Sequence, residues 1–133
     1  MPRRPPPSLE QYKECARFAH EVNEIGAMGV LDELLAQETD SAHACQMGIW
    51  FWTLGHRQLA AMAYRRSLEL GKSAAAHFNL AVCQDDLEQP DQALEAMRRF
   101  YELVPNDAER TQAEGMLREH GKAHLIRHPS SCS

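Results

Sequence analysis

Residues 41–73 read SAHACQMGIWFWTLGHRQLAAMAYRRSLELGKS, and this stretch decides the fold class. When the sequence is shifted by 33 residues in either direction, small and apolar residues coincide. A small residue, a second one twelve positions later and a bulky apolar one four beyond that are typical of two antiparallel helices that cross closely. The coinciding residues are Cys15, Gly48 and Ala81; Ala27, Ala60 and Ala93; and Leu31, Tyr64 and Met97. The chain is therefore predicted to be a stack of helix pairs.

The same columns resemble the tetratricopeptide repeat (TPR) family, whose pattern is W-x2-L-G-x2-Y, then A-x3-F, then P. The middle unit matches with Ala44-x2-Met47-Gly48-x2-Phe51 and Ala60-x3-Tyr64. The last unit reads His77-x2-Leu80-Ala81-x2-Gln84 and Ala93-x3-Met97, and it ends at Pro105; the first keeps Cys15, Phe18, Ala27 and Leu31. Tryptophan is missing from its column, and Lys72 replaces the proline of the middle unit. The resemblance covers residues 8–107.

This resemblance implies an all-α, right-handed α-solenoid of three helix-turn-helix units and a capping helix. We expect the units at about 8–40, 41–73 and 74–107. Asn106 and Glu109 form a capping box that opens the capping helix at about 107–120. Residues 8–121 are then one TPR domain, preceded by a disordered proline-rich head at 1–7 and followed by a polar tail at 122–133.

Composition excludes several classes of function. The chain has 133 residues, 44% of them hydrophobic, and 14 basic against 19 acidic residues give a net charge of -5. Without a basic stripe, nucleic acid is not expected as a partner. Apolar runs are too short for a membrane span or a signal peptide. The four cysteines form no Cys-x-x-Cys pair, which favours reduced thiols in the cytoplasm.

Three patterns look like sites of chemistry, and each has a simpler interpretation. Gly71-Lys72-Ser73 resembles the end of a phosphate-binding loop, but Arg66 stands where the loop needs glycine. His120, His124 and His128 have the spacing of a metal site, but Gly121 and Pro129 favour helix termination, so we expect solvated histidines.

The third pattern is acidic. Asp85, Asp86 and Glu88 precede Pro90, and we expect a solvated edge that faces a partner. A pair of catalytic carboxylates needs two contrasting environments, which a helix end in water does not supply. We expect no catalytic residues, no metal and no cofactor.

The remaining candidate is a groove. In the family that the chain resembles, the first helix of each unit lines the concave face, and helical spacing then places twelve residues there. The apolar stripe with an acidic end favours a segment with Leu, Ile or Phe anchors and a Lys or Arg near Asp85 and Asp86. The alternative is that Trp52, Phe78 and Val82 are core between adjacent units, with no ligand. The twelve are Tyr12, Ala16, Ala19, His20, Cys45, Ile49, Trp52, Thr53, Phe78, Val82, Asp85 and Asp86.

Family members that clamp acidic C-terminal tails use Lys, Arg and Asn along this stripe, and none of these residue types occurs in it. We therefore expect a non-catalytic protein-protein interaction module, an adaptor or chaperone, that binds a hydrophobic or basic amphipathic segment of another protein. One alternative is a self-associating scaffold subunit, since Trp50 cannot share the face of Trp52 and would form an exposed patch with Ile49. Another is a small chaperone similar in architecture to those of type III secretion.

Overall fold

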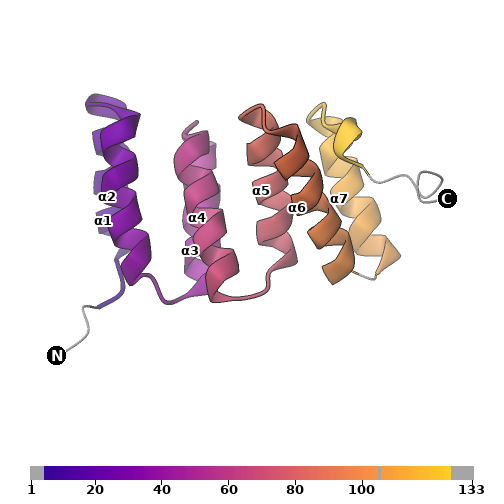
Figure 1. The fold of residues 1–133 in the computed structure, drawn as a ribbon, viewed down its shortest axis with the longest axis horizontal. Coiled ribbons are helices and arrows are strands. Elements are labelled where there is room, and N and C mark those ends of the chain that lie inside the picture. The colour runs from indigo at the N-terminus through magenta and orange to yellow at the C-terminus, as the bar shows by residue number, and fades with distance from the viewer. Residues whose placement is uncertain (1–4, 105, 127–133) are drawn as a thin grey trace. The chain divides into compact units, whose positions relative to one another are not determined.

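The computed structural model describes residues 5–104 and 106–126, which form seven α-helices and one 3-10 helix (Figure 1). The chain divides into two compact units, Met1–Lys72 and Ser73–Ser133. From here on, the first and the second unit mean these two parts and not the three predicted repeats. Every helix in the described ranges is too short or too polar to cross a bilayer. The helices are α1 (Leu9–Glu21), α2 (Glu24–Gln37), α3 (Ser41–Thr53), α4 (Arg57–Leu70), α5 (Ala74–Asp86), α6 (Pro90–Leu103), α7 (Asp107–Glu119) and η1 (Ala123–Leu125).

Polar side chains cap the helix starts where the sequence places them. The Ser8 hydroxyl accepts from the Gln11 amide, and the Gln11 side chain accepts from the Ser8 amide, which makes a complete capping box. Asp40 accepts the amides of Ala42 and His43 at the start of α3. The Ser73 hydroxyl accepts the amide of Ala76 at the start of α5. Gly71 thus ends α4, and Ser73 caps the next helix.

Three helices end in the same hydrogen-bonded turn. After α3 the Gly55 amide bonds to the Trp52 carbonyl and the His56 amide to the Phe51 carbonyl, with Gly55 at φ +90°. The turn recurs 33 residues later, where Glu88 occupies the left-handed conformation at φ 60°. It recurs again after α7, where Gly121 has φ +72° and the Lys122 amide bonds to the Leu117 carbonyl.

The first unit contains two antiparallel pairs, α1 with α2 and α3 with α4, and α2 also packs on α4 (Figure 1). The repeat columns mark the crossings. A Cβ atom on Gly48 would lie 2.4 Å from Cε1 of Tyr64, so α3 and α4 approach closely only because position 48 has no side chain. In the first pair, the Cys15 thiol donates to the Ala27 carbonyl at 3.3 Å. Burial raises the pKa of this thiol to about 11.

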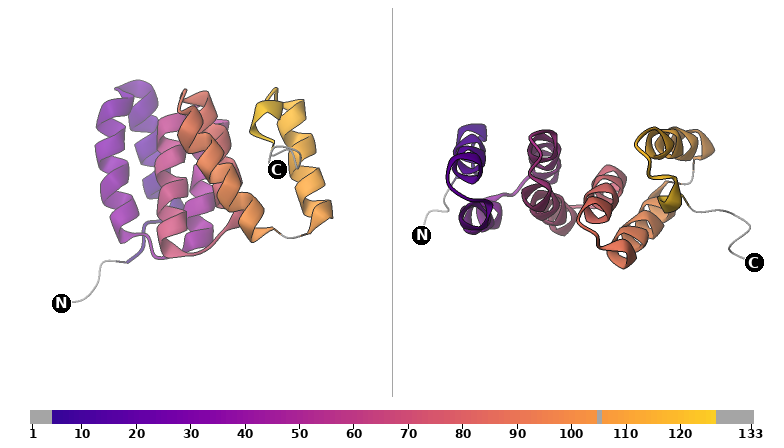
Figure 2. Two further views of the ribbon diagram at one scale, coloured as in Figure 1. Left: turned by 45° about the vertical axis from the view of Figure 1, so that its right-hand side comes forward. Right: turned by 90° about the horizontal axis from the view of Figure 1, so that it is seen from above.

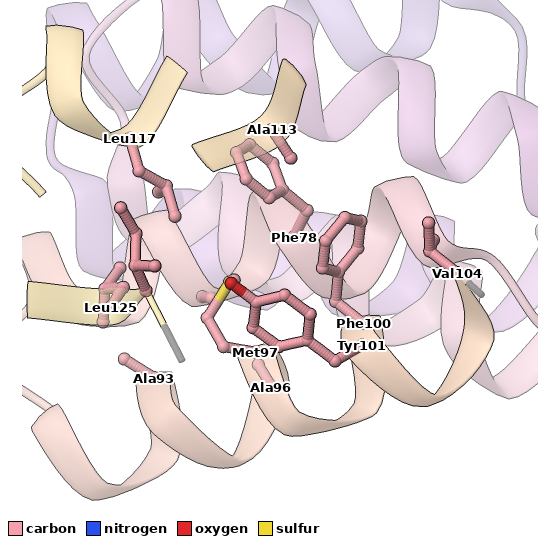
Figure 3. Close-up of a cluster of buried hydrophobic side chains, with 12 residues drawn as sticks. Phe78, Ala93, Ala96, Met97, Phe100, Tyr101, Val104, Ala113, Leu117 and Leu125 are labelled. Carbon is pink, nitrogen blue, oxygen red and sulfur yellow. The ribbon is translucent and has the colours of Figure 1, made fainter. Parts of the chain in front are cut away.

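The second unit packs α7 and η1 onto the pair α5–α6. Figure 3 shows Phe78 beside Phe100, with Met97, Leu117 and Leu125 in the same cluster of buried side chains. The rings of Phe78 and Phe100 have centroids 5.4 Å apart. In Figure 2 the yellow turn of η1 follows α7 and lies back toward α6, which η1 contacts.

The structure changes both predicted ends of the domain. Pro7, expected in the disordered head, is buried immediately before α1. Residues 122–126, expected in the polar tail, include η1 and two buried side chains, Leu125 and Ile126. These two side chains belong to the core cluster of the second unit, because burying them removes apolar surface from water. The other residues of the predicted head and tail, 1–4 and 127–133, lie outside the described part of the chain.

Candidate interaction surface

The first residue of each predicted stripe is buried in its own unit. Tyr12, Cys45 and Phe78 are 33 residues apart, and their exposed fractions are 0%, 9% and 9%. Ala16 and Ala19 are buried as well. These side chains offer a ligand little or no surface and belong to the core of their own unit. The first residue of each predicted stripe therefore points into the interior and not toward solvent.

Tyr12 belongs to a buried polar network around Glu38. The Tyr12 hydroxyl donates to Oε1 of Glu38 at 2.7 Å, and Nδ1 of His43 lies 2.7 Å from the same oxygen. The amides of Thr39 and Asp40 donate to Oε2, each at 3.1 Å. Glu38 is fully buried, so these four partners replace the water that a carboxylate otherwise requires.

The same network joins four successive helices of the first unit. Tyr12 comes from α1, Glu38 follows α2, His43 lies on α3, and Nη2 of Arg66 on α4 donates to the Glu38 carbonyl at 2.9 Å. Burial, followed by the hydrogen bond to Glu38, raises the pKa of Tyr12 well above its usual value. The phenol therefore stays protonated and donates throughout the physiological range. The network holds the two helix pairs of this unit together.

The exposed part of the stripe in the first unit lies on α3. Ile49 is 38% exposed, and Trp52, three residues further on the same face, is half-buried. The guanidinium of Arg57 lies 5.1 Å from the centroid of the Trp52 ring, a cation-π contact that orients the indole. Thr53, next to it, is exposed, and so is His20 on α1. Trp50 is half-buried, with its ring 5.3 Å from that of Phe51.

In the second unit the acidic end of the stripe is paired within the chain. Nζ of Lys122 lies 2.6 Å from Oδ2 of Asp85 and 2.7 Å from Oδ1 of Asp86, and Nε2 of His124 lies 2.7 Å from Oδ1 of Asp85. The expected solvated edge is thus wrong for these two aspartates. Their side chains are only 15% and 23% exposed.

The pairing shifts the protonation equilibria of both partners. Burial alone would raise the pKa of Asp85, but the hydrogen bonds from Lys122 and His124 outweigh it and lower that pKa. Burial alone would lower the pKa of Lys122, and its bonds to Asp85 and Asp86 raise it instead. Both pKa shifts favour the charged forms of Asp85 and Lys122. The resulting ion pair fixes residue 122 to the end of α5.

The apolar part of the same face is covered as well. Phe78 belongs to the core cluster and Val82 packs against it, and the cluster also contains Leu125 and Ile126. The four predicted residues of α5, Phe78, Val82, Asp85 and Asp86, are therefore brought together on one side of the unit. Lys122 and His124 bond to the aspartates at the end of α5, while η1 contacts α7 and α6. Sequence reasoning missed this attachment, although a lysine followed at three and four residues by Leu and Ile was visible.

A second exposed apolar surface lies at the turn between α1 and α2. Phe18, Val22 and Ile25 are 38%, 62% and 83% exposed. The Phe18 ring lies against Gly26, where a Cβ atom would come within 2.6 Å of it. We name these three residues the corner patch. The sequence pattern offered a signal that went unused, since α2 carries apolar residues on nearly all sides.

The other look-alike sites do not assemble. α7 ends at Glu119, so His120 and His124 do not share a helical face, and His128 lies outside the described residues. Over the described residues, no three His, Cys, Asp or Glu side chains come together as metal ligands do. Cys15, Cys45 and Cys83, the cysteines of the described residues, are buried thiols.

The comparisons with known proteins point to the fold. No family model matches the chain, and no curated protein matches its sequence. Among solved structures, the crystal structure of MamA, a TPR-like protein, is similar with a TM-score of 0.54 and 18% sequence identity. The likeness covers 87% of this chain and 70% of that one. The described residues form seven α-helices, six of which pack as three pairs, and the fold is an α-solenoid of helical repeats.

Proposed function

We propose that this chain is a non-catalytic adaptor or chaperone that binds an apolar segment of another protein on the exposed face of α3. The fold supports a role in protein interaction, since helical-repeat proteins of this type are protein-interaction or scaffold modules. The observation that supports binding of an apolar segment is the surface of α3. Ile49 and Trp52 share a face, and Arg57 holds the indole beside the exposed isoleucine.

The surface has the composition of an interaction hot spot. Tryptophan and arginine are enriched at such sites, because a rigid ring buries a large area at low entropic cost. Phe78 and Tyr12, which sequence reasoning gave the same task, belong instead to the core. Binding is thus proposed to rest on Ile49, Trp52 and the adjacent Thr53, with His20 on α1 as a further exposed residue of the predicted stripe.

The test is a substitution that removes the surface without touching the core. Ile49→Ala is expected to weaken partner binding by about tenfold or more, while the unfolding midpoint stays within the error of the wild type. Thr111→Ala, at an exposed position of α7, is the matched control. Unchanged affinity for a partner captured by the wild-type chain would contradict the proposal, and a large loss of stability would show that Ile49 is core.

A second candidate function, self-association, is favoured by the corner patch. An isoleucine 83% exposed beside two other exposed apolar residues is a feature of interfaces. This candidate predicts that the mass in solution rises with protein concentration and that Ile25→Glu abolishes the rise. A concentration-independent monomer mass in light scattering would remove it.

A further inference from the structure

Residues 122–126, which we name the C-terminal strap, lie on the second unit as a short bound segment. Their backbone hydrogen bonds are local: the amides of Lys122, Leu125 and Ile126 bond to the carbonyls of Leu117, Lys122 and Ala123. Side chains fix the strap to the rest of the unit. Lys122 and His124 bond to the end of α5, and Leu125 and Ile126 enter the core cluster.

The strap contacts two chemically different surfaces, the two aspartates that end α5 and the apolar core cluster that Leu125 and Ile126 enter. Phe78, Val82 and Asp85 are spaced at i, i+4 and i+7 on α5 and therefore lie on one side of the helix. The first two are apolar, and the third carries the negative charge, with Asp86 beside it. A segment that fits needs a cation at one end and branched apolar side chains at the other.

The strap supplies these groups from within the chain. The stripe predicted from the sequence favours a ligand with Leu, Ile or Phe anchors and a Lys or Arg near Asp85 and Asp86. Lys122 occupies the cation position, and Leu125 is 2% exposed in the cluster. The strap thus has the chemistry that is expected of a partner, and it is joined to α7 through Gly121, whose φ of +72° forms the turn.

We propose that the strap is an internal occupant of a docking site formed by the end of α5 and the core cluster beside α6 and α7, and that a partner segment with Lys or Arg three residues before Leu or Ile displaces it. This inference rests on the proposed function and adds to it the chemistry of the partner and a means of regulation. Because a tethered segment has an effective concentration in the millimolar range, the strap competes strongly with a free peptide. The site is open only in the fraction of molecules whose strap is released.

The experiment measures binding of a fluorescein-labelled peptide with the sequence of residues 121–126, GKAHLI, to the full chain. Lys122→Glu places a negative charge against Asp85 and Asp86 and is expected to release the strap. Its affinity for the peptide should exceed that of the wild type by about tenfold or more. Lys13→Glu, the same charge change at an exposed ion pair of α1, should bind like the wild type.

Two further variants make the result decisive. Asp85→Lys should lose binding of GKAHLI, and a peptide with glutamate in place of lysine should not bind Lys122→Glu. Circular dichroism verifies folding, and Lys122→Met serves as a milder release if Lys122→Glu unfolds. Hydrogen exchange of residues 122–126 in the wild type should rise when peptide is added in excess.

Three outcomes would overturn the inference. If folded Lys122→Glu binds no peptide, the strap is only part of the core. If both Lys122 variants unfold, it is core that cannot be displaced. If wild type and Lys122→Glu bind equally and Asp85→Lys blocks both, the site exists but the strap does not regulate it, and the proposed function stands. The proposed function itself is tested separately, by the affinity of Ile49→Ala for the partner.

Discussion

Position 48 carries only a hydrogen atom, and this allows α3 and α4 to cross. We predict that Gly48→Ala destabilises the chain by about 1–3 kcal/mol, because the added methyl group would overlap the Tyr64 ring. Gly29→Ala in α2, where a Cβ atom meets nothing within 4 Å, is the matched control and should stabilise by about 0.5–1 kcal/mol. Urea denaturation measures both. Equal effects of the two substitutions would mean that position 48 is not a close crossing.

Glu38 is the residue on which the polar network of the first unit depends. Glu38→Ala leaves the buried Tyr12 hydroxyl without its acceptor and is predicted to cost about 2–4 kcal/mol. Tyr12→Phe removes one of four donors and should cost about 1 kcal/mol. Because the two residues share a bond, the double variant should be less destabilised than the sum of the single variants. Additive losses would contradict a coupled pair.

At the scale of elements, the ion pairs of Lys122 make the attachment of the strap depend on pH. The pKa of Asp85 is lowered from 3.8, so the stabilisation is complete above that pH and is lost as the pH falls through the lower folded value. The pKa of Lys122 is raised from 10.5, so the stabilisation is complete below that pH and is lost as the pH rises past it.

Lys122→Met is the variant that measures this contribution. We predict that it destabilises the chain by about 1 kcal/mol, discounted for the partial exposure of the pair. The difference from the wild type should shrink as the pH falls below 3.8 and as it rises above 10.5. Unfolding midpoints measured across the pH range provide the data. A difference that stays constant at both extremes would show that the pairing does not support the strap.

The elements also show what sequence can predict. The crossings at Gly48, Ala60 and Tyr64 follow from column spacing, because helix packing permits few residue sizes there. The helix starts at Ser8, Asp40 and Ser73 follow from local capping chemistry. By contrast, the burial of Tyr12 depends on Glu38, 26 residues away, and no local pattern reports a contact of that kind.

The strap was missed for a different reason. Gly121 correctly indicates the end of α7, and a helix end close to the polar residues 130–133 was interpreted as the start of a tail. The contacts of Lys122 with Asp85 and Asp86 span more than 35 residues of sequence, and nothing near Lys122 predicts them. The pair Leu125–Ile126 was the available signal, because adjacent branched apolar residues are seldom left in water.

At the scale of the whole molecule, the central claim is that the exposed face of α3 receives another protein. Photo-crosslinking tests it most directly, with benzoylphenylalanine placed at position 49 in the native cell and at position 111 as the control. The account predicts a crosslink to a distinct protein from position 49 and none from position 111. Equal crosslinking from both positions, or crosslinks only to other copies of this chain, would contradict it.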